Sequence, residues 1–129
     1  MDVGDPSNFV RILEIFKNDD SKLKEVLSSY AFTDKETQNA MKEIKEKYHY
    51  IADPHGAVGY LGLKKQGVDA NAFGVFLETA HPVKFLNVVE PIINQTINIP
   101  KQIKEVIDKE KVSIKISTYQ ELKDFLLNS

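Results

Sequence analysis

The residues of this sequence best suited to chemistry lie together in residues 79–84. Thr79 supplies a hydroxyl group, His81 an imidazole ring and Lys84 an ammonium group. An apolar run, residues 73–77, precedes them without alternating with polar residues, as is typical of a strand buried on both faces of a parallel sheet. The proline after the histidine suits the first position of a helix. We therefore expect this stretch between the end of a strand and the start of a helix, where open α/β sheets bind anions.

Each of these three side chains also has an ordinary structural explanation. Thr79 could end a strand or cap the turn that follows it. His81 could cap the start of the helix or bond to backbone, and Lys84 could run past Phe85 to solvent. Arg11 is the only arginine; it could bind an anion through both of its terminal nitrogens, or pair with a carboxylate on a helix.

A second polar stretch, residues 53–62, combines a predicted helix start with three glycines. Asp53 is better suited to capping a helix that begins at Pro54 than to acid or base chemistry. His55 could line a cleft or be satisfied by its neighbours. A glycine inside a helix costs up to about 1 kcal/mol relative to alanine. Close approach of the backbone to a sheet or a ligand is the expected reason for such glycines.

Composition excludes several classes of function. The net charge of −2 over 129 residues gives no reason to expect nucleic acid or an acidic membrane as a partner. The absence of cysteine excludes a disulfide scaffold, a thiolate metal site and a cysteine nucleophile. The three histidines are too far apart for a local metal motif, so no metal site is expected. With no signal peptide and no apolar run of membrane-spanning length, we expect a cytoplasmic protein.

The elements that must position these residues alternate along the chain. Short strands are predicted at 50–52, 73–79 and 112–116, and a parallel arrangement is expected because helices separate them. Helices are predicted to open at four prolines and at two capping boxes. The four prolines are Pro6 (with Asp5 as its cap), Pro54, Pro82 and Pro100, and the boxes are Thr33 with Glu36 and Thr118 with Glu121.

The predicted fold class is α/β: a small parallel sheet flanked by helices, in a helix-rich single domain over residues 1–129. Apolar helical stripes are expected in the regions 9–16, 23–30 and 40–48, and Pro91 is expected to end or kink the helix that Pro82 opens. Three strands are few for 129 residues, and a strand buried on both faces needs neighbours. We therefore expect part of a larger fold, with an exposed apolar face along the run at 73–77.

Three segments resemble the threonine synthase family, in the family's order. They are residues 1–11 (its MDVG-PSN-R segment), residues 53–60 (its DPH-AVG segment) and residues 79–85 (its TAHP-KF segment). The resemblance implies a pyridoxal-phosphate enzyme of fold type II, a lyase that converts O-phosphohomoserine and water to threonine and phosphate. Gly56 departs from the hydroxyl residue of the family motif, which removes the polar contact that the motif would offer there.

The resemblance also implies how the site would be divided. Thr79 would bind the pyridine nitrogen of the cofactor, and Lys84, His81 and His55 would bind the substrate. In the family, the Schiff-base lysine and the glycine-rich cradle for the cofactor phosphate precede the MDVG segment. Neither is found in residues 1–129, so we expect a C-terminal portion with no catalytic residue of its own, inactive without the remainder of the enzyme chain. The competing hypotheses are a non-catalytic α/β interaction module and a paralogue that has lost catalysis.

Overall fold

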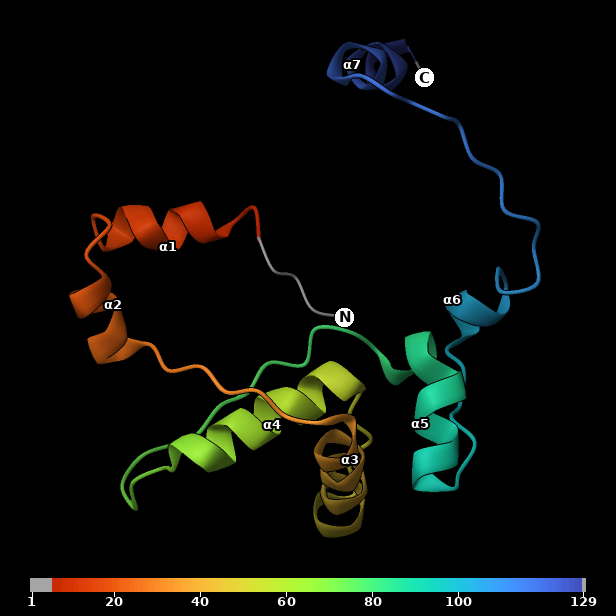
Figure 1. Ribbon diagram of the computed structural model, residues 1–129. Coiled ribbons are helices and arrows are strands. Elements are labelled where there is room, and N and C mark those ends of the chain that lie inside the picture. The colour runs from red at the N-terminus through yellow and green to blue at the C-terminus, as the bar shows by residue number, and fades with distance from the viewer. Residues whose placement is uncertain (1–5, 129) are drawn as a thin grey trace. The chain divides into compact units, whose positions relative to one another are not determined.

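The computed structural model describes residues 6–128, which form helices joined by turns and extended segments (Figure 1). The elements are α1 (Phe9–Ile15), α2 (Asp20–Val26), α3 (Asp34–Tyr48), α4 (Pro54–Gln66), the 3-10 helix η1 (Pro82–Phe85), α5 (Leu86–Ile93), α6 (Lys101–Lys104) and α7 (Tyr119–Asn128). The chain groups into two compact units, one ending at Ile97 and one beginning at Asn98. A single domain over the whole chain stays a prediction.

Helix α3 begins at the first predicted capping box. The Glu36 N–H donates to Thr33 Oγ1 at 3.3 Å, and the Thr33 N–H donates to a Glu36 carboxylate oxygen at 2.7 Å. Two backbone donors of the first turn are thus satisfied by side chains. The predicted apolar stripe of α3 is buried at Ala40, Met41 and Ile44, whereas its last member, Tyr48, is 53% exposed. His49 ends the helix in the left-handed conformation, at φ 54°.

The core of the first unit lies where α3 contacts α4 and α5 (Figure 1). It is built mainly from aliphatic side chains, and Tyr60 is the aromatic residue buried among them. Its buried members are Ala40, Met41, Ile44, Ala52, Ala57, Tyr60, Val89, Ile93 and Ile97. Ala52 and Ala57 are small, so the start of α4 can lie close to α3. The beginning of the polar stretch 53–62 therefore lies against the core.

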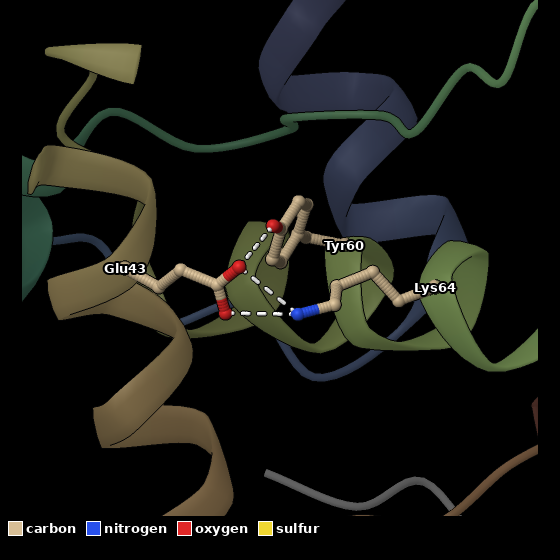
Figure 2. Close-up of polar contacts among 3 residues, drawn as sticks. All are labelled: Glu43, Tyr60 and Lys64. Atoms are coloured by element: carbon tan, nitrogen blue, oxygen red, sulfur yellow. Dashed lines mark hydrogen bonds and ion pairs between the residues drawn. The ribbon is translucent and has the colours of Figure 1, made fainter. Parts of the chain in front are cut away.

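A polar clamp joins the outer sides of α3 and α4 (Figure 2). The Tyr60 hydroxyl donates to Glu43 Oε1 at 2.9 Å, and Lys64 Nζ donates to both oxygens of the same carboxylate at 2.9 and 3.0 Å. The Lys64 ammonium, and next the Tyr60 hydroxyl, hold the pKa of Glu43 below its usual value. Burial, and next the bond to Glu43, raise the pKa of Tyr60, so the tyrosine stays a donor.

The predicted parallel sheet is wrong for the described residues, which contain no strand. Residues 50–52, 73–79 and 112–116 lie outside helices, but none of them pairs with another, and residues 73–79 make no backbone–backbone hydrogen bond within residues 6–128. A strand is stabilised by pairs of side chains across to a neighbouring strand, so an apolar run without such a neighbour does not become part of a sheet. The predicted burial of 73–77 on both faces is also wrong, because Phe73 is 98% exposed and Leu77 is 77% exposed. These exposures confirm the expected exposed apolar face.

Several predicted helix boundaries need correction. α1 begins at Phe9, three residues after Pro6, while the predicted cap Asp5 lies outside the described residues. α2 ends at Val26, so its stripe does not reach Tyr30. Pro82 opens a four-residue 3-10 helix before α5 begins. Pro91 does not end α5, which continues for two residues past it, although a proline at the sixth helical position removes one backbone hydrogen bond.

The second unit contains α6 and α7 and the extended residues between them. Pro100 precedes α6 as its N-cap residue rather than occupying the first helical position. The second predicted capping box is confirmed, because the Glu121 N–H donates to Thr118 Oγ1 and the Thr118 N–H donates to Glu121 Oε2, both at 3.2 Å. Across residues 6–128, every helix falls short of the length and apolar character needed to cross a bilayer.

Candidate functional site

The N-terminus of α4 is the most tightly organised polar position of the first unit. Asp53 is 0% exposed, and its Oδ1 accepts the N–H of His55 at 2.6 Å and the N–H of Gly56 at 2.9 Å. Pro54 occupies the next position, where no N–H needs a partner. The predicted cap at Asp53 is therefore confirmed, and both of its side-chain bonds are used to start the helix.

Glu78 brings the end of the extended segment 73–79 to this helix start. Its Oε1 accepts the Asp53 N–H at 2.7 Å, across 25 positions of sequence. The Glu78 carboxyl group lies against the α-carbon of Gly56, because a Cβ atom added at that glycine would overlap it. Segment 73–79 runs back along α4 (Figure 1), and Phe76 packs edge-on against Tyr60 with ring centroids 6.0 Å apart.

Two carboxyl oxygens at this junction are buried and have no hydrogen-bond partner within residues 6–128. They are Asp53 Oδ2 and Glu78 Oε2. Burial raises the pKa of Glu78, and the nearby Asp53 carboxylate raises it further, while the Asp53 N–H and His55 act in the opposite direction. The pKa of Tyr50 is also raised, first by burial and then by the negative charge of Glu78 and Asp53. The junction therefore favours a protonated Glu78 more than solvent does.

His55 and Phe85 join the start of α4 to η1. Their rings meet edge to face with centroids 5.3 Å apart. Both residues line a cavity of about 330 Å³ between α3, α4 and α5, together with Thr37 and Met41 of α3. A larger hollow of about 550 Å³ lies elsewhere on the unit, along Gly59 and Gly62 of α4, and none of the predicted site residues lines it.

The structure places Thr79 directly after Glu78, exposed, with no hydrogen bond to any residue of the described chain. Capping the turn was the structural explanation considered for Thr79, but His81 is the residue that caps η1. Its Nδ1 accepts the Val83 N–H at 3.1 Å. Lys84 is exposed on η1 and forms no ion pair within residues 6–128. Within residues 6–128, the Thr79 hydroxyl, the second nitrogen of His81 and the Lys84 ammonium thus have no hydrogen-bond or ion-pair partner.

The predicted site residues therefore gather at one end of the first unit. The Glu78–Asp53 bond ties the residue before Thr79 to the start of α4, and the ring contact ties His55 to the end of η1. Arg11 is exposed on α1 and forms no hydrogen bond or ion pair with them. No group of three potential metal ligands occurs among residues 6–128.

Comparison with known proteins identifies the family. The family described as "Threonine synthase, C-terminal" matches residues 56–126. The chain belongs to the threonine synthase family. Threonine synthase of Escherichia coli (strain K12) is 42% identical over 108 residues, which cover 84% of this chain and 24% of that protein. Threonine synthase of Buchnera aphidicola subsp. Acyrthosiphon pisum is 38% identical over 128 residues, covering 98% and 29% respectively.

A solved structure supports the same assignment. The crystal structure of threonine synthase from Escherichia coli matches with a TM-score of 0.77 and 37% identity, covering 99% of this chain and 29% of that one. The chain thus covers 24% to 29% of the length of these threonine synthases. The resemblance seen in three short segments is confirmed along the chain.

Glu78 is the polar residue of the site that sequence reasoning missed. The apolar run before it suggested only a strand, and nothing local indicates that position 78 meets position 53. Two features of the sequence could have indicated the contact. An acidic residue at the end of an apolar run needs a polar partner if it is buried, and glycines at the start of a helix indicate close approach of another group. The contact between Glu78 and Gly56 answers both requirements.

Proposed function

We propose that this chain forms the C-terminal part of a threonine synthase that converts O-phosphohomoserine and water to threonine and phosphate, with pyridoxal phosphate as cofactor. The similarity to threonine synthases along nearly the whole chain carries the proposal. The remainder of such an enzyme would supply the lysine that binds the cofactor and the cradle for its phosphate. The chain by itself would be inactive, and a cytoplasmic location stays a prediction.

The residues present fit one contact to the cofactor. Thr79 has an exposed hydroxyl without a partner in the described chain, at the end of a segment anchored to α4. Such a hydroxyl can bond to the pyridine nitrogen. When bound, pyridoxal phosphate supplies an electron sink for the substrate's reacting carbon. Because a threonine hydroxyl is neutral, it would hold the ring without forcing a proton onto the nitrogen, as a carboxylate would.

Lys84, His81 and His55 are proposed to bind the substrate. Lys84 supplies a positive charge that no carboxylate of residues 6–128 neutralises, which suits the substrate's phosphate group. His81 uses Nδ1 for its cap and keeps Nε2 for a ligand. His55 lies against Phe85, next to Lys84, so its ring can limit the space around a bound substrate. The four-residue η1 contributes too short a dipole to add to this binding.

A chimeric enzyme tests the proposal. Residues 1–129 would replace the matching C-terminal part of Escherichia coli threonine synthase, and phosphate release from O-phosphohomoserine would be measured. The chimera should be active, and Thr79→Val should lower kcat while retaining most of the cofactor. The lost hydrogen bond is worth only about 1 kcal/mol in binding. Lys84→Gln should raise KM, because it removes the positive charge proposed to bind the substrate phosphate.

Matched substitutions away from the site provide controls. Thr96→Val and Lys104→Gln change the same side chains at exposed positions that contact none of the site residues, and both should leave kcat and KM unchanged. A folded chimera that binds pyridoxal phosphate but releases no phosphate would contradict the proposed activity. It would favour an interaction module or an inactive paralogue instead. Full activity of Thr79→Val would remove Thr79 from the cofactor site.

A further inference from the structure

Few polar contacts within residues 6–128 hold the segment that ends at Thr79. Residues 73–79 form no backbone–backbone hydrogen bonds among the described residues, and three of their apolar side chains are exposed: Phe73, Val75 and Leu77. Phe76 packs on Tyr60 near the middle of the segment, three residues from Thr79. Beyond that contact, the segment's one polar attachment in residues 6–128 is the bond from the Asp53 N–H to Glu78.

Glu78 is also held by shape. Its carboxyl group fills the space beside the α-carbon of Gly56, and a methyl group at position 56 would overlap it. The carboxyl group is thus held on one side by the Asp53 N–H and on the other by the bare backbone of the first helical turn. A glycine at this position has a packing reason, since no strained dihedral angle requires it.

We propose that Glu78 is a positioning residue for Thr79: its carboxyl group, held between the Asp53 N–H and the α-carbon of Gly56, fixes where the Thr79 hydroxyl lies relative to α4. The proposal rests on the proposed contact between Thr79 and the cofactor. It adds a residue pair, Gly56 with Glu78, whose sizes must match. A larger side chain at position 56 or a shorter one at position 78 should therefore displace Thr79 without altering its hydroxyl group.

The charge state of the junction is consistent with this role. The carboxyl group of Glu78 faces Asp53 and His55, both from the start of α4, and Tyr50 from the segment before it. Burial and the Asp53 carboxylate favour the protonated form of Glu78. A protonated carboxyl group still accepts the Asp53 N–H through its carbonyl oxygen, so the attachment does not require charge. Glutamine should therefore replace Glu78 with little loss.

The first test uses the 129-residue chain itself, by amide hydrogen exchange and NMR chemical shifts. Glu78→Ala should make the Asp53 amide exchange about tenfold faster, as expected for losing a bond of this type, and should shift the Thr79 amide resonance. Glu78→Gln should restore both, and the matched control Glu46→Ala, at an exposed position of α3, should change neither. Gly56→Ala should shift the Thr79 resonance as Glu78→Ala does. Unchanged Asp53 exchange in Glu78→Ala would overturn the proposal.

The second test uses the chimera, with pyridoxal phosphate bound. Glu78→Ala should lower kcat and shift the absorption band of the bound cofactor in the same direction as Thr79→Val. The double variant should be no worse than Thr79→Val alone, because both changes remove one contact. Gly56→Ala should lower kcat when Glu78 is present and should lower it much less when combined with Glu78→Gly. An active chimera in which Glu78→Ala has the wild-type kcat and spectrum would overturn the proposal, whereas an inactive unmodified chimera would contradict the proposed function instead.

Discussion

Replacing Asp53 by alanine should destabilise the first unit through one identifiable cause, the loss of the α4 cap. Losing an N-cap side chain typically costs about 1 kcal/mol. Here the site is buried, and the N–H groups of His55 and Gly56 lose their common acceptor where water cannot fully replace it. Each unsatisfied buried donor costs about 1–3 kcal/mol. Removing the buried, unpartnered Oδ2 of Asp53 offsets part of this destabilisation, so we expect the free energy of unfolding to fall by about 2 kcal/mol.

Asparagine provides the matched comparison. Asp53→Asn keeps an oxygen that accepts both N–H bonds and removes the negative charge that faces Glu78, so its effect on stability should be small. Amide exchange of the first turns of α4 measures the difference locally, and urea unfolding followed by circular dichroism measures it for the chain. A loss of 2 kcal/mol corresponds to about thirtyfold faster exchange through the opened state.

The exposed cap of α3 supplies a second reference point. Thr33→Ala removes an equivalent side-chain acceptor, but water can reach the freed Glu36 N–H, so the loss should be at the low end of the usual range, about 0.5–1 kcal/mol. The ranking Asp53→Ala, then Thr33→Ala, then Asp53→Asn is the expected result. Equal exchange rates in the alanine and asparagine variants at position 53 would refute the reasoning, because burial of the cap would then have no energetic consequence.

Three further outcomes are expected. Tyr60→Phe should lower the free energy of unfolding in urea by about 1 kcal/mol by removing the bond to Glu43. Lys64→Met should cost less, because both side chains of the ion pair are partly exposed to water; the reverse order would contradict this. Because the pKa of folded Glu78 is raised, the folded chain keeps a proton that the unfolded chain has released. That stability is present below the ordinary glutamate pKa and lost as pH rises through the folded pKa; Glu78→Gln should flatten this decline, and an unchanged pH profile would contradict it. The 129-residue chain alone should release no phosphate from O-phosphohomoserine, and pyridoxal phosphate followed by borohydride should label its lysines weakly and diffusely; one dominant labelled lysine, Lys84 included, would contradict this.

Local sequence signals were sufficient for the helix starts that a side chain caps, less accurate for those predicted from a proline alone, and insufficient for the sheet. The caps at Thr33 and Asp53 were predictable because a side chain two or three residues away satisfies the first N–H groups, and nothing distant is needed. The strands were not, because a strand forms only with a neighbour, and an apolar run does not reveal whether the same chain supplies one. Glu78 escaped notice for a related reason: its partner lies 25 residues earlier in the chain.

The extended segment 73–79 shows how a buried-strand sequence behaves when the chain covers only one of its faces. Phe76 and Glu78 contact α4, while the alternate residues Phe73 and Leu77 are exposed, so the segment keeps the two-residue period of a strand without its ladder. The run without polar alternation requires cover on both faces, and the matching threonine synthases are much longer than this chain. Glu78 already holds the end of the segment against α4, so the backbone that a neighbouring strand would pair with is already ordered. Pairing with that strand would therefore cost less conformational entropy.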